Sequence, residues 1–165
     1  MSDTPSSPPN NPNQSHLPIL ERQYPDIVGT VMAFDFGEKR IGVAVGETIL
    51  KAAHPVTTIE AETNDVKVAK ISDIIKEWRP SLLVVGLPTY MDGTEHTLTH
   101  LAKKFAQRLE ARFNLPVTMI DERLTSVEAA QNLQAAGIKG HKQKNLLDAV
   151  AAQGILQSYF NQLPY

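Results

Sequence analysis

Acidic residues stand at three places in the sequence where burial of a charge costs free energy. Asp35 interrupts the apolar run of residues 31–36, and Asp121 and Glu122 end a second apolar run. Asp148 lies on the apolar face of a C-terminal helical pattern, on the same face as Ala152. An ionised carboxylate in such a setting costs several kcal/mol unless it is paired, hydrogen-bonded or metal-bound. These acids are therefore candidates for a chemical role.

Two interpretations of the acids stay open on the residues alone. A single Asp at a strand end commonly caps a turn or pairs with a cation, and Arg40, Arg123 and Lys144 could serve as partners. Converging carboxylates, however, repel each other unless cations lie between them, and hard oxygen ligands suit Mg²⁺ or Mn²⁺. Two such ions about 4 Å apart form the usual clamp for attack on a phosphodiester. The second interpretation is thus a two-metal phosphodiester hydrolase.

The strands that must position the acids are visible as short apolar runs. Five segments have this pattern: residues 28–36, 40–46, 50–59, 81–88 and 116–123. The first three are joined by connections too short for a crossover helix, which predicts an antiparallel meander. The fourth, SLLVVGLP, is continuously apolar, as is typical of a central strand covered on both faces.

Helical periodicity or capping residues mark the remaining segments. They are residues 64–79, 94–113, 125–137 and 144–160. A meander followed by alternating helices and strands predicts an α/β fold, with a mixed five-stranded sheet of three antiparallel and two parallel strands and helices on both faces. We expect one domain over residues 28–165. Residues 1–27 are rich in Pro, Ser and Asn, which predicts a disordered tail in which only LPIL could dock.

Composition excludes several other classes of protein. The 165 residues carry a formal net charge of −2, which argues against a strongly basic nucleic-acid binder. Cysteine is absent, no apolar run approaches a membrane span, and no signal pattern opens the chain, so we expect a cytoplasmic protein without a membrane partner. Basic residues still gather in two groups, which are either solvated faces or local binding patches. They are His96, His100, Lys103, Lys104, Arg108 and Arg112, and Lys139, His141, Lys142 and Lys144.

Four motifs in order resemble one known family. FDFGEKRIGVAVGE, VVGLPTYMDGTE, DERLTSVEA and LLDAVAA together are similar to the YqgF (RuvX) family of pre-ribosomal-RNA nucleases, also described as resolvase-like. The similarity covers residues 29–159. It implies an RNase H-like fold and a nuclease that acts in maturation of the 5′ end of pre-16S rRNA during ribosome biogenesis.

The resemblance also implies roles for individual residues. Asp35, Glu122 and Asp148 would be the catalytic acids and would hold Mg²⁺ or Mn²⁺. Because side chains alternate along a strand, only one of Asp121 and Glu122 should face the site. We favour Glu122 and leave Asp121 to hold the loop or Arg123.

Further motif residues are predicted to contact substrate phosphate, and each has a structural alternative as a turn or salt-bridge residue. They are Gly37, Arg40, Asp92, Arg123 and Lys144. Asp92 belongs to the loop GLPTYMDG, which leaves the carboxyl end of a strand, where α/β sheets commonly bind ligands.

Three rival functions need to be distinguished from an rRNA nuclease. A Holliday junction resolvase acting on branched DNA would need a symmetric dimer, whereas we expect a monomer. An ATP hydrolase of the actin and sugar-kinase group would need a second domain, for which the chain is too short. A non-catalytic RNA-binding module for ribosome assembly would keep its RNA affinity without the acids.

Overall fold

The computed structural model describes residues 17, 19, 22–88, 97–122 and 140–164, with the side chains of residues 122 and 140–145 left out. The strands are β1 (Thr30–Phe36), β2 (Arg40–Glu47), β3 (Ala52–Glu60), β4 (Leu82–Pro88) and β5 (Val117–Glu122). The helices are α1 (Asn64–Trp78), α2 (Thr97–Phe113) and α4 (Gly140–Asn161). None of these helices has an apolar stretch that could span a bilayer in the part of the chain described.

The strands form a five-stranded sheet in the order β3-β2-β1-β4-β5. β1, β2 and β3 pair antiparallel, and β4 and β5 extend the sheet parallel to β1. The predicted meander with two parallel strands is confirmed. β1 is therefore the central strand, with a neighbour on each side.

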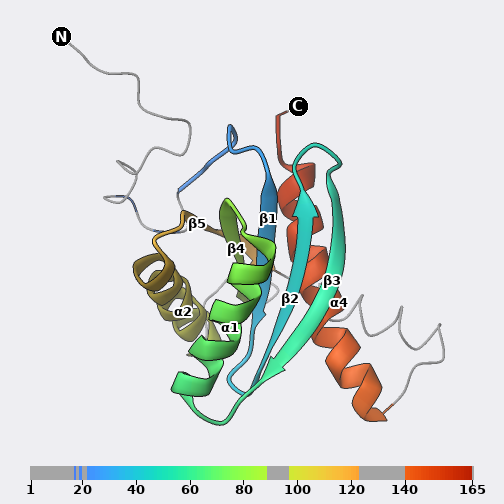
Figure 1. The fold of residues 1–165 in the computed structure, drawn as a ribbon. Helices are drawn as coiled ribbons and strands as arrows, with labels where there is room; N and C mark the ends of the chain where they lie inside the picture. Colours follow the sequence, from blue (N-terminus) through green and yellow to red (C-terminus); the bar gives the residue numbers. More distant parts are fainter. Residues whose placement is uncertain (1–16, 18, 20–21, 89–96, 123–139, 165) are drawn as a thin grey trace.

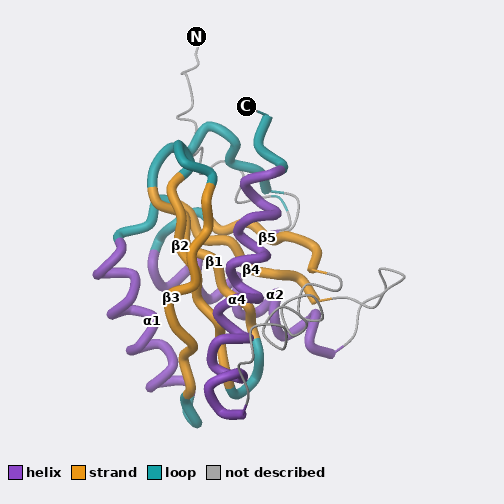
Figure 2. Tube along the Cα trace, turned by 90° about the vertical axis from the view of Figure 1, so that its right-hand side faces the viewer, coloured by secondary structure: helices purple, strands orange, loops and turns teal. Residues whose placement is uncertain are grey.

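Helices cover both faces of this sheet, as predicted (Figure 1). One core packs α1 and α2 against the sheet through residues such as Ile71 and Phe105. The other packs α4 against the opposite face through Ala152, Ile155 and Leu156 (Figure 2). Because neighbouring residues of a strand point to opposite faces, Met32 and Phe34 belong to the first core, and Val31 and Ala33 belong to the second.

Beyond Arg40, the α4 face of β2 carries only glycine and alanine, at Gly42, Ala44 and Gly46. Built on Gly46, a Cβ would lie 2.7 Å from a ring atom of Phe160 on α4. Gln153 and Gln157 of α4 donate hydrogen bonds of 2.9 Å to the carbonyl oxygens of Ala53, on the edge strand β3, and of Lys51, just before it. Small residues and these amide contacts together allow α4 to lie close against the meander.

Several predicted boundaries shift. α1 begins as expected at Asn64, where the Thr63 hydroxyl accepts a hydrogen bond from the backbone N–H of Val66 at 3.3 Å. α4 begins at Gly140 and not at Lys144, so the helix extends through the polar segment that sequence periodicity did not assign. The predicted helix over residues 125–137 lies outside the described residues.

The predicted disordered tail is wrong for residues 22–27. Tyr24 and Ile27 are buried in the core beneath α4, and burial raises the pKa of the Tyr24 phenol above its usual 10.0. Arg22 is 7% exposed and forms an ion pair with Glu110 of α2. Ile19, from the LPIL segment, is buried in the other core. The tail was predicted from composition, which does not reveal a few anchoring side chains.

Candidate active site

Asp35 lies on the face of the sheet that α4 covers. Val31 and Ala33, which share its alternation along β1, both belong to the core beneath α4. Asp35 itself is partly buried and pairs in register with Gly42 of β2. Cross-strand partners present their side chains on the same face, so the position of Gly42 adjoins the Asp35 carboxylate.

Gly42 brings α4 to this point. A Cβ built on Gly42 would lie 1.8 Å from the backbone carbonyl oxygen of Asp148, a separation that no side chain tolerates. The backbone of α4 at Asp148 therefore rests directly on β2, beside the cross-strand partner Asp35. Two of the predicted acids, distant in sequence, share one sheet face and one neighbourhood.

The Asp148 carboxylate has a defined partner. Its Oδ2 lies 2.7 Å from Nε of Arg40, with the two side chains 19% and 37% exposed. The sequence left open whether Arg40 would neutralise Asp35 or contact phosphate, and the structure pairs it with Asp148. This ion pair fixes the orientation of one acid while the guanidinium remains partly open to solvent.

The two acids at the end of β5 are not equivalent. Val117 and Met119, which share the alternation of Asp121, belong to the core on the α1 and α2 side. Asp121 is exposed, and this alternation places it on the face opposite Asp35. Glu122 pairs in register with Pro88 of β4, and its side chain lies outside the description. The choice of Glu122 over Asp121 stays a prediction. It is favoured because Asp121 lies on the face opposite Asp35.

Gly37 has a structural reason to be glycine. A Cβ there would lie 2.6 Å from the backbone carbonyl oxygen of Arg40, so the tight connection between β1 and β2 excludes a side chain. Its predicted contact with substrate stays untested. Asp92 and Arg123 lie outside the described residues, and Lys144 belongs to α4 without a described side chain.

The donors on this face suit a divalent cation in their chemistry. Asp35 and Asp148 both offer carboxylate oxygens, the ligands that Mg²⁺ and Mn²⁺ prefer. Among the side chains that the structure describes, no three His, Cys, Asp or Glu residues gather into a metal-binding group. Of the three predicted ligands, Asp35 and Asp148 have described side chains and Glu122 does not, so the ligand set stays a prediction.

Gly42 is the residue to which the sequence reasoning gave no role. Gly42 lies in the motif FDFGEKRIGVAVGE, where the apolar pattern predicts only that it belongs to a strand. A glycine inside a strand pattern is a known signal for close approach of another backbone, so the signal was present.

The strand order, with one acid on the central strand and another on the helix packed across it, defines an RNase H-like α/β protein. The model of the RuvX family, described as Holliday junction resolvase, matches residues 29–162. The chain belongs to this family, and membership makes it a nuclease.

The names of similar proteins differ from the description of the family. A protein of Methylobacillus flagellatus named "Putative pre-16S rRNA nuclease" is 62% identical over 82% of this chain and 92% of its own length. A protein of the same name from Dechloromonas aromatica is 59% identical over 81% of this chain and 91% of its own.

Among solved structures, RuvC of Thermus thermophilus aligns with 79% of this chain and 93% of its own, at 14% identity and a TM-score of 0.48.

Proposed function

We propose that this chain is a metal-dependent nuclease that hydrolyses phosphodiester bonds in maturation of the 5′ end of pre-16S rRNA. The observation that carries the proposal is the contact of α4 with β2 at Gly42, which puts Asp148 beside the cross-strand partner of Asp35. We assign Asp35, Asp148 and Glu122 as the acid set. The rRNA substrate is inferred from the names of relatives at 59–62% identity.

The acids would act as a charged cradle for one or two Mg²⁺ or Mn²⁺ ions. Such ions, when bound, supply the activation of water and the stabilisation of the leaving oxygen in phosphodiester hydrolysis. The chain's own contribution is to fix the carboxylates on rigid elements: Asp35 on the central strand β1, and Asp148 on a helix whose backbone contacts the neighbouring strand β2 at Gly42.

Arg40 would serve the site in two ways. Its ion pair holds the Asp148 carboxylate in one orientation and offsets its charge. A partly exposed guanidinium next to that carboxylate is also suited to a substrate phosphate, which it can bind with paired N–H donors. We assign Arg40 as a positioning residue that contacts the RNA backbone.

Recognition of the backbone phosphate carries no sequence information by itself. The cut position would therefore depend on the shape of the precursor RNA or on its protein partners. We expect the protein to act as a monomer in the cytoplasm, where the precursor is assembled into ribosomal subunits.

The experiment compares Asp35→Asn with Asp121→Asn on a precursor of 16S rRNA, with and without Mn²⁺. Asp35→Asn keeps the side-chain shape, so it should fold normally by circular dichroism. It should lose cleavage by about 100-fold or more, the scale of losing one preorganised electrostatic contact to the transition state. Asp121→Asn alters an acid on the opposite face and should cleave like the wild type. Normal cleavage by a folded Asp35→Asn variant would remove the proposal.

Resolution of Holliday junctions is the second candidate, because the matching family carries that description. The same variants should be assayed on a four-way DNA junction and on precursor RNA side by side. Faster cleavage of the junction, together with a dimer in sedimentation, would favour the resolvase. RNA binding by a wild-type protein that cleaves neither substrate, with the same affinity after loss of the acids, would instead favour an assembly module.

A further inference from the structure

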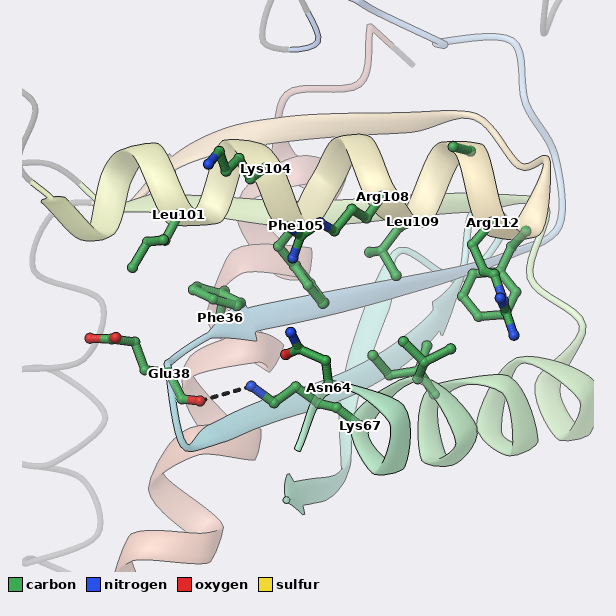
Figure 3. A pocket seen from close by; sticks show the side chains of 14 residues that line it. Phe36, Glu38, Asn64, Lys67, Leu101, Lys104, Phe105, Arg108, Leu109 and Arg112 are labelled. Atoms are coloured by element: carbon green, nitrogen blue, oxygen red, sulfur yellow. Dashed lines mark hydrogen bonds between the residues drawn. The ribbon is translucent and has the colours of Figure 1, made fainter. Parts of the chain in front are cut away.

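A groove of about 710 Å³ opens between α1 and α2, on the sheet face opposite α4 (Figure 3). Its floor and walls are largely apolar. The apolar residues that line it include Phe36, Val68, Ile71, Leu101, Phe105 and Leu109. Ile71, Phe105 and Leu109 are buried at its floor, whereas Phe36, Val68 and Leu101 are partly exposed and offer the apolar surface that a ligand could reach.

Cationic side chains border this apolar floor. Lys104, Arg108 and Arg112 recur every fourth residue along α2 and so form one row, and Lys67 stands on α1 across the groove. In Figure 3 the row runs along the upper edge, with Lys67 below it. The acid at the groove, Glu38, lies at one end, where its backbone carbonyl accepts a hydrogen bond from Lys67 Nζ at 2.8 Å.

This positive rim stands out on the molecule. Ion pairs found in the described part of the chain join other residues, Arg22 to Glu110 and Arg40 to Asp148. The formal net charge of the whole chain is −2, so the rim is a local excess of positive charge and not a general property of the surface. Its charges are available to an acidic ligand.

The aromatic rings of the groove argue against a nucleic-acid strand. Proteins that bind single strands stack bases on exposed aromatic faces. Here the rings of Phe36 and Phe105 pack against each other, with centroids 4.9 Å apart, and Phe105 is 9% exposed. Phe105 therefore offers little open ring face on which a base could stack.

We propose that the α1–α2 groove docks an acidic amphipathic helix of a protein partner. Apolar side chains at one face of that helix would fill the floor, and flanking Asp or Glu residues would meet Lys67, Lys104 and Arg108. This is the helix-in-groove mode of recognition, with charge complementarity that fixes the orientation.

The docking surface is separate from the candidate active site. Phe36 lines the groove, whereas its neighbour Asp35 lies on the α4 face. A helix bound in the groove would therefore leave the acids open to substrate. The proposal goes beyond the nuclease function and does not depend on it.

The test selects binders from a displayed library of helical peptides with randomised surface positions, using the full-length protein. Selected peptides should share apolar residues at i, i+4 and i+7 with acidic flanks. Arg108→Glu should weaken their binding about tenfold or more, because it places like charges together. Lys76→Glu, the same charge reversal at an exposed position of α1 outside the groove, should leave the affinity unchanged.

A short single-stranded RNA, measured by fluorescence anisotropy, is the second arm. The proposal would be overturned if the selected peptides lacked acidic flanks. It would also be overturned if their affinity were the same for the wild type and Arg108→Glu. A loss of RNA affinity in Arg108→Glu with no acidic peptide selected would overturn it as well and would identify the groove as a nucleic-acid surface. RNA affinity that is equal in wild type and Arg108→Glu would support the peptide assignment.

Discussion

Arg40 and Asp148, 108 residues apart in sequence, form an ion pair of 2.7 Å that joins the start of β2 to α4. The pair lies on the same sheet face as Asp35, and Gly42, which α4 contacts, is two residues beyond Arg40. One strand thus supplies both the space for the helix and the charge that orients its acid.

Arg40→Ala tests this relationship. Partly exposed ion pairs contribute up to about 1 kcal/mol, so the free energy of unfolding in urea should change by no more than that. The rate of cleavage of precursor RNA should nevertheless fall clearly, since the Asp148 carboxylate loses its orientation while the fold remains intact. Lys39→Ala, in the same connection but exposed, is the control and should cleave normally. Equal activity of the two variants would show that the pair is only structural.

Gly42→Ala tests the contact between α4 and β2. The added methyl group would meet a backbone oxygen, which cannot rotate away, so we expect a loss of about 2–3 kcal/mol or more in the free energy of unfolding. Asp35→Asn changes the cross-strand partner of Gly42 without adding a non-hydrogen atom, so the stability of this variant should remain close to that of the wild type. A stable, fully active Gly42→Ala variant would contradict the close packing.

Binding of a divalent cation can be measured without any substrate. A ligand at 100 times its Kd stabilises the folded state by about 2.7 kcal/mol, so saturating Mn²⁺ should raise the Tm of the wild type by several degrees. Asp148→Asn and Asp35→Asn should show a much smaller rise, and Asp121→Asn the full one. Equal shifts in all four proteins would place the cation elsewhere.

Deletion of residues 1–27 tests the boundary of the domain. The deletion removes Ile19, Tyr24 and Ile27 from the two cores, and a buried side chain of this size contributes about 1.5–3 kcal/mol. We expect a large loss of thermal stability. Deletion of residues 1–16 keeps these side chains and should have little effect. Similar melting curves for the two deletions would restore the boundary at residue 28.

Local patterns were sufficient for most of the fold. The apolar runs and short connections predicted the meander, and α1 begins after its N-cap Thr63 and ends before Pro80. These features depend on residues near each other in sequence, for which the periodicity of side chains is a direct guide. The order of residues 22–27 was not predicted, because these residues are held by partners far away in sequence, such as Glu110, and local patterns do not report such contacts.

The sequence by itself determined the order of the elements and the acids on which the nuclease proposal rests, since both follow from residue type and short-range spacing. The tertiary structure alone decided that Arg40 meets Asp148, that α4 contacts Gly42, and that α1 and α2 leave a cationic groove between them. These relationships depend on the distances between packed elements. Such distances are set by the side chains of both partners at once, and no single stretch of sequence contains them.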